Sequence, residues 1–253
     1  MPLHLGRPLE ILIAIWEIGL VTVIIWRVVR AIRKSRAAGP EGKAEDAYSR
    51  IRAAARTTLP FRRVADAIGY EIAVTAYALF GADRKLTLPG RAFSYHRKNG
   101  YGAIVFGLMF AMIAETGGVH LLLVHFHHPR IALLLTVLSL YGALWFLGDY
   151  QAARRRPIRI EADHLAICTE LRWNLDVPFA AIQKIERPDP LRPFQKGRGA
   201  IRATLFGAPL FVLHLNEPLV ADGPYGRQAL VERVGFTVDE DAEFLAALPD
   251  GAT

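Results

Sequence analysis

The sequence predicts an α-helical membrane domain, residues 1–150, followed by a small antiparallel β barrel or sandwich with a C-terminal capping helix, residues 151–253. Hydrophobic residues make up 52% of the 253 positions, more than most soluble domains contain. The long apolar runs lie in the first part, and short stretches of alternating polarity follow Pro157. The positive charge also lies in the first part. Residues 1–150 contain 18 Lys and Arg and 10 Asp and Glu, whereas residues 151–253 contain 13 and 14.

Three apolar runs are long enough to cross a bilayer, for which a helix needs roughly 20 apolar residues. The first is residues 8–26, and a dense run of cations follows it. The second, residues 101–126, is long enough either to tilt or to break at Thr116-Gly117-Gly118. The third, residues 131–148, contains no charge. We therefore expect three transmembrane helices.

A fourth helix is expected at about residues 66–82. Its apolar part, Ile68 to Phe80, is 13 residues long and contains Glu71, and runs of this length are more often interfacial, re-entrant or buried than spanning. Three segments are rich in Lys and Arg: residues 27–65, 83–100 and 154–156. Such segments favour the cytoplasm, and all three can lie there only if the fourth helix does not cross. The predicted topology therefore has three spans rather than four, with the N-terminus outside and the C-terminal domain in the cytoplasm.

A further helix is predicted at residues 44–58, before Pro60. Its arginines, which include Arg52 and Arg56, have two interpretations. They either lie close to anionic lipid headgroups or serve only to set the orientation of the chain in the membrane.

Polar residues inside the predicted spans are the main candidates for chemistry: Glu17, Glu115 and His120. They could form hydrogen bonds between helices, conduct protons or ions, or contribute to a metal site. Glu115, His120 and the histidines at 125, 127 and 128 are metal-ligand types, but their spacing departs from a pair at i and i+4. We therefore predict no metal, and His120 and His127 are the nearest candidates for ligands.

Seven short strands are predicted in the second part: residues 158–161, 165–169, 172–177, 183–187, 200–206, 210–215 and 230–237. The final helix is expected to begin at Thr237-Val238-Asp239-Glu240, which has the pattern of a capping box, and to bury Phe244. Cys168 alternates with its neighbours as a strand residue does, so we expect a buried core side chain. As the only cysteine, it forms no disulfide within the chain.

A resemblance adds to this reading. The segment PIRIEADHLAICTELRWNLDVPFAAIQKIE resembles the opening of bacterial pleckstrin-homology-like (PH-like) domains, and VERVGFTVDEDAEFLAAL is similar to their last strand and capping helix. LNEPLVADGPYGR resembles the link that precedes that strand. FSYHRKNGYGAI, ETGGVHLLL and LGDY resemble segments of uncharacterised bacterial multi-pass proteins that carry such a domain. The resemblance implies a PH-like fold and a place in the cell inner membrane. Domains of this shape usually bind lipid headgroups, peptides or copies of themselves.

One cationic cluster lies in the C-terminal domain, and its candidates for binding an anion or an anionic lipid are Arg192, Lys196, Arg198 and Arg202. The alternative is a solvated loop. The sequence contains no nucleotide-binding loop, nucleophile elbow or paired-cysteine motif, so no cofactor is predicted. No pattern indicates nucleic-acid binding.

The leading hypothesis is a non-catalytic membrane-anchored binding or assembly protein. Its expected partners are the lipid bilayer, anionic lipids, and an unknown protein partner or further copies of itself. The cytoplasmic domain would dock on that partner or on the inner leaflet. The alternative is an intramembrane ion- or proton-handling protein, or a metal-dependent enzyme, that uses Glu17, Glu115 and His120.

Overall fold

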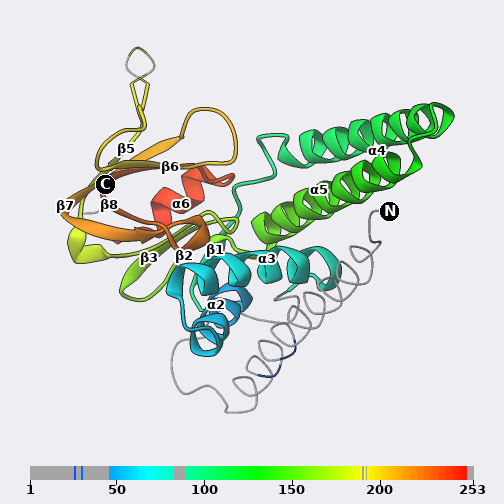
Figure 1. Ribbon diagram of the computed structural model, residues 1–253. Helices are drawn as coiled ribbons and strands as arrows, with labels where there is room; N and C mark the ends of the chain where they lie inside the picture. The colour runs from blue at the N-terminus through cyan, green and yellow to red at the C-terminus, as the bar shows by residue number, and fades with distance from the viewer. Residues whose placement is uncertain are drawn as a thin grey trace.

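The first part of the chain is mainly helical, with one short strand, and the second part forms most of a curved sheet and one further helix (Figure 1). The computed structural model describes Trp26, Arg30 and residues 46–82, 89–189, 191 and 193–249. Its helices are α2 (Ala47–Thr58), α3 (Arg62–Phe80), α4 (Tyr101–His125), α5 (Pro129–Arg155) and α6 (Asp241–Ala247). Its strands are β1 (Arg91–Phe93), β2 (Ile158–Ile160), β3 (His164–Thr169), β4 (Trp173–Pro178), β5 (Ile182–Glu186), β6 (Ala200–Ala203), β7 (Phe211–Asp222) and β8 (Gln228–Phe236). Two short 3₁₀ turns, η1 (Phe179–Ala181) and η2 (Pro224–Gly226), complete the fold.

Helices α4 and α5 form an antiparallel hairpin that extends away from the sheet (Figure 1). Both helices are long and apolar enough to cross a membrane. No other helix in the described ranges meets these two criteria. Helix α4 continues without a break through Thr116-Gly117-Gly118, and α5 continues beyond the predicted end of the span at residue 148. The predicted first span, residues 8–26, lies outside the described residues except for Trp26. The structure therefore supports two of the three predicted membrane helices.

Helix α3 begins four residues before its predicted start and ends at Phe80, where Gly81 takes the left-handed conformation with φ of 52°. It crosses α5 at a very close approach, because a Cβ atom on Gly148 would lie 2.3 Å from the carbonyl oxygen of Val74. Its buried side chains, which include Tyr70 and Tyr77, pack against α2, α5 and the β3–β4 turn. One face of α3 is therefore covered by protein along most of its length.

Helix α2 begins at Ala47, where the Asp46 side chain accepts a hydrogen bond of 2.8 Å from the Ser49 backbone. Its Arg52 is buried, and Arg52 and Arg56 both bind the carboxylate of Asp66 on α3, at 2.9 and 2.6 Å. These two arginines therefore do not point to lipid headgroups. Their shared partner lies in a neighbouring helix, which the local sequence pattern does not reveal.

The sheet has eight strands in the order β1-β2-β3-β4-β7-β8-β6, and β5 pairs with β7. It is mostly antiparallel, but β6 pairs with β8 in parallel, so the predicted purely antiparallel arrangement is wrong at this edge. Strand β1 lies within the segment 83–100 that is rich in Lys and Arg, where the sequence pattern predicts no strand. Strand β7 continues to Asp222, past the predicted end at residue 215, and its pairing with β8 shifts register around Pro218. Proline usually ends a central strand, so the pattern indicated a loop there.

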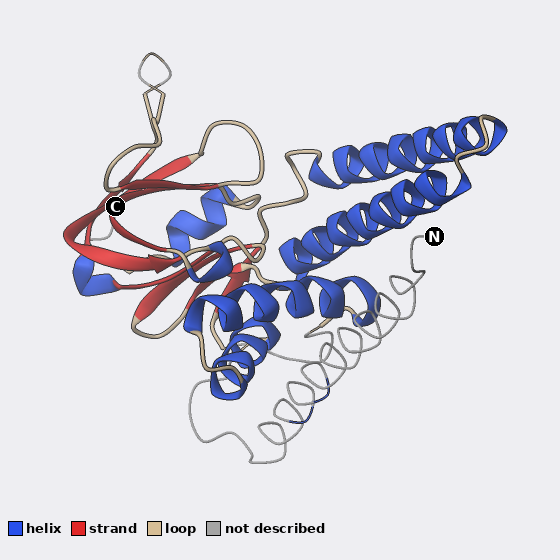
Figure 2. Cartoon of the chain, in the orientation of Figure 1, coloured by secondary structure: helices blue, strands red, loops and turns tan. Residues whose placement is uncertain are grey.

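Helix α6 lies inside the curve of the sheet (Figure 2). The ring of Phe244 is fully buried, with its centroid 5.3 Å from that of Phe93 on β1 and 5.6 Å from that of Phe236 on β8. Strands near opposite ends of the sheet therefore meet on one side chain of this helix.

The predicted capping box does not form, because α6 begins at Asp241 and Glu240 before it makes no side-chain cap. The Thr237 hydroxyl instead accepts from the Leu210 backbone. Asp239 accepts from the Ser94 hydroxyl and from the backbone of residues 97 and 98. The side chains expected to cap α6 therefore fix two neighbouring loops.

Candidate functional site

The polar residues predicted inside the membrane do not come together in the structure. Glu115 is exposed on α4 and makes no hydrogen bond or ion pair within the described residues. His120 Nδ1 lies 2.8 Å from the Thr136 hydroxyl of α5, on the wall of a groove of about 480 Å³ between the two helices. The other wall residues are mainly apolar, and Glu115 is not one of them. Glu17 lies outside the described residues.

The candidate metal ligands are also separate. His127 lies in the turn between α4 and α5 with a positive φ of 63°, whereas His120 bonds to Thr136. Among the residues that the structure describes, no three His, Cys, Asp or Glu side chains are grouped as a metal ion would require. Cys168 is buried in β3, as expected, and burial raises the pKa of its thiol.

The predicted anion-binding residues lie around the loop between β5 and β6. Lys196 and Arg198 are exposed and form no ion pair within the described part of the chain. Arg202 donates to the Phe194 backbone carbonyl at 3.2 Å. Arg192 lies outside the described residues. This loop therefore carries uncommitted positive charge.

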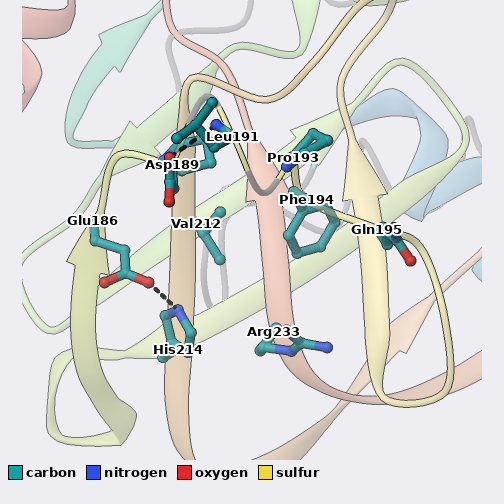
Figure 3. Close-up of a pocket in the computed structure, with 10 residues that line it drawn as sticks. Glu186, Asp189, Leu191, Pro193, Phe194, Gln195, Val212, His214 and Arg233 are labelled. Atoms are coloured by element: carbon teal, nitrogen blue, oxygen red, sulfur yellow. Dashed lines mark hydrogen bonds and ion pairs between the residues drawn. The ribbon is translucent and has the colours of Figure 1, made fainter.

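The same loop forms one wall of a pocket of about 590 Å³ (Figure 3). Its floor is the outer face of the sheet, with Val212 and His214 on β7 and Arg233 on β8. The register places His214 opposite Arg233, so the two side chains lie on the same face. The end of β5 closes one side with Glu186. The site thus combines apolar side chains on its floor and loop wall with the charged groups Glu186, Asp189 and Arg233.

Phe194 holds the loop against the sheet. Its ring is 7% exposed and packs with Val212 and Ala200. Opposite it lies Gly235, where an added Cβ would come within 2.9 Å of the Phe194 ring. The glycine therefore provides the space that lets the loop close over β8. Leu191, three residues before Phe194 in the loop, is left 90% exposed.

The charged groups of the pocket differ in their partners. Glu186 accepts from Lys184 at 2.6 Å and lies 2.9 Å from His214 Nε2. The hydrogen bond from Lys184, together with that from His214, lowers the pKa of Glu186. One oxygen of Asp189 accepts from the Leu191 backbone at 2.8 Å. Arg233 is exposed and has no ion pair or side-chain hydrogen bond among the described residues. Its guanidinium group is therefore available to a ligand.

A second polar cluster is buried where the helices meet the sheet. Arg156, which follows α5 and is fully buried, binds Asp46 at 2.5 Å and also donates to the Glu170 carbonyl. It lies over the ring of Tyr48 at 4.9 Å. Burial alone would lower the pKa of Arg156, but the Asp46 carboxylate raises it overall. This cluster joins α2, α5 and the turn between β3 and β4.

Two buried carboxylates lie beside it. Arg172 lies 3.2 Å from a Glu170 oxygen and 3.5 Å from an Asp149 oxygen, and Tyr101 donates to Asp149. Glu170 is fully buried, and neither carboxylate oxygen accepts a hydrogen bond within the described residues. Burial and the nearby Asp149 carboxylate raise the pKa of Glu170 to about 8. Both carboxylates are buried between the helices and the sheet, so we assign this pair to the junction rather than to a reaction.

No family model, no curated protein and no solved structure matches this chain. The site therefore has to be interpreted from its own geometry. The sequence directed attention to the cationic loop, but not to His214 or Arg233, because one strand pattern does not show what lies across the sheet. It also did not single out Glu170, which occupies a turn with a positive φ of 43°.

Proposed function

We propose that this chain is a non-catalytic membrane-anchored docking protein whose sheet domain binds a protein partner at the pocket between β5, β7, β8 and the 187–196 loop. The observation that carries the proposal is Leu191. This large apolar side chain is 90% exposed at the rim of a pocket, whereas the neighbouring Phe194 on the same loop is buried against Val212 and Ala200. Exposed apolar groups beside a concave site are typical of interaction surfaces.

The α4–α5 hairpin is the proposed membrane anchor. Its apolar side chains face outward, including Phe110 at 76% and Leu121 at 72% exposure, so it differs from the core helices of a soluble protein. Aromatic side chains gather at its base, where the Tyr101 ring lies 6.1 Å from Tyr150 and 5.5 Å from Phe206. Tyrosine and other aromatic residues favour the membrane interface. We place that interface at this end of the hairpin.

Figure 1 shows the loop between β5 and β6 extending out from the sheet, to one side of the α4–α5 hairpin. Lys196 and Arg198 on this loop are exposed and form no ion pair within the described part of the chain, so both are available to a partner.

We further infer that the sheet lies in the cytoplasm of a cell with α3 near the inner-membrane interface, as the distribution of Lys and Arg predicts. The PH-like resemblance supports a binding role of this kind. A three-span topology, with residues 8–26 as the first span, belongs to the same proposal.

Photo-crosslinking in living cells tests the docking function. A photoreactive amino acid replaces Leu191 in the full chain, and a matched variant carries it at Arg227, an exposed residue that follows η2. We expect a discrete protein adduct from position 191 and none from position 227. Adducts only with lipid, or no adduct at position 191, would refute the proposal.

A further inference from the structure

The free charge in the pocket is positive on the side of β8. Arg233 has no partner in the described structure, whereas Glu186 is already bonded by Lys184 and lies beside His214. Lys196 and Arg198 add two further uncommitted cations next to the loop wall. Asp189 opposes them, but one of its oxygens is used by the Leu191 backbone. A negatively charged group on a ligand would therefore bind most favourably beside Arg233.

The apolar part of the pocket lies next to this charge. Val212 forms the floor, Phe194 covers one side and Leu191 stands at the rim. Figure 3 shows Arg233 below Phe194, and His214 beside it on the neighbouring strand. An apolar ligand group on Val212 and a carboxylate on Arg233 could therefore belong to adjacent residues of one segment.

We infer that the pocket recognises a short acidic segment of a partner protein, in which a large apolar side chain packs on Val212, Phe194 and Leu191 and a neighbouring Asp or Glu carboxylate binds Arg233. This inference rests on the proposed docking function and names the chemistry of its partner. Arginine suits this role, because its planar guanidinium group can donate two parallel hydrogen bonds to a carboxylate.

A peptide library of random sequence, displayed on phage and selected against the full chain in detergent micelles, tests the inference. We expect enriched peptides to carry Asp or Glu next to a large apolar residue. The Arg233→Gln variant should bind the enriched peptides at least about tenfold more weakly, since a hydrogen bond to a charged group is lost. The matched variant Arg227→Gln makes the same change in charge at an exposed site away from the pocket and should bind as the wild type does.

Charge reversal gives a second readout. Selection against Arg233→Glu should enrich Lys or Arg beside the apolar residue in place of the acids. Thermal unfolding of each variant shows whether it is folded, and Arg233→Lys, which keeps the charge but loses the planar fork, should bind with intermediate strength.

These experiments distinguish a failure of the acidic-ligand inference from a failure of the docking function on which it rests. Enriched peptides that lack acidic residues, or that bind Arg233→Gln as well as wild type, overturn the acidic ligand and leave docking intact. A library that yields no enriched peptide at all contradicts both. Binding of phosphatidylglycerol vesicles by the full chain in nanodiscs, lost in Arg233→Gln and not displaced by the enriched peptides, would assign the site to lipid and overturn the inference.

Discussion

Asp46 and Arg156 form a buried ion pair at 2.5 Å between residues 110 positions apart in the sequence. Arg156 is fully buried and Asp46 is 7% exposed. The pair joins the start of α2 to the end of α5 and, through the Glu170 carbonyl, to the β3–β4 turn. Helices α2 and α5 and the sheet are therefore connected through one guanidinium group.

Replacing Arg156 by Met should strongly destabilise the protein. The change leaves the Asp46 carboxylate buried without its cation, and breaking a buried pair in this way costs about 3–5 kcal/mol. Chemical unfolding of the detergent-solubilised chain measures the effect. Arg154→Met is the control, because Arg154 is exposed and lies over the Tyr150 ring at 5.6 Å, so we expect a loss of under about 1 kcal/mol. Equal stability of the two variants would show that the pair is dispensable.

Glu170→Gln should stabilise the protein increasingly as the pH rises from about 5 to 8. The folded-state pKa of Glu170 is raised from 4.5 to about 8, so the native state binds more protons than the unfolded state across this window and loses stability as the pH rises. Glutamine removes that dependence. We expect a gain of about 4 kcal/mol at pH 8 and little difference at pH 4, where both states are mostly protonated. A difference between the melting temperatures of wild type and variant that stays constant from pH 4 to 8 would contradict this assignment.

Gly148→Ala should disrupt the crossing of α3 over α5. The added methyl group would lie 2.3 Å from the Val74 carbonyl oxygen, so the helices must separate, and overpacking of this kind typically costs about 1–3 kcal/mol. Gly117→Ala is the matched control on α4, where a Cβ meets no atom within 4 Å. Melting temperatures of the two variants in the same detergent test the prediction, which fails if the Gly148 variant is as stable as the Gly117 variant.

Leu191→Asp should abolish partner binding without changing stability. The side chain is 90% exposed, so its replacement removes almost no buried surface from the free protein. In a complex, however, an exposed apolar residue at the rim of a pocket is expected to become buried. Binding of the enriched peptides and the melting temperature are measured together. Unchanged peptide binding would place the docking surface elsewhere.

Parts of the fold follow directly from the sequence. Helices α4 and α5 are recognisable because a bilayer demands long apolar runs, and residues 101–126 and 131–148 meet that demand. Most strands of the sheet show the alternation that one buried face imposes. The three-residue β1 and the passage of β7 through Pro218 leave no comparable pattern.

The sequence predicts only part of the candidate site, because some of its residues come together through pairing between distant segments. The cations of the 187–196 loop stand out in the sequence, whereas Arg233 matters because the register places it opposite His214. Similarly, the sequence shows Arg52 and Arg56 only as part of a cluster of positive charges. The tertiary structure shows that both bind the Asp66 carboxylate on α3. Pairings between distant segments are products of the tertiary fold, and no alternation or spacing within one segment encodes them.

The continuity of α5 has a mechanical consequence. It is one helix from Pro129 to Arg155, and its last turn is buried with Asp149 and Ala152 between α3 and the sheet. In a bilayer, a change in membrane thickness alters the tilt of such a helix. Because only Arg156 and Pro157 separate α5 from β2, the sheet and its pocket would turn with the helix, and the direction of the proposed binding site would then follow the thickness of the membrane.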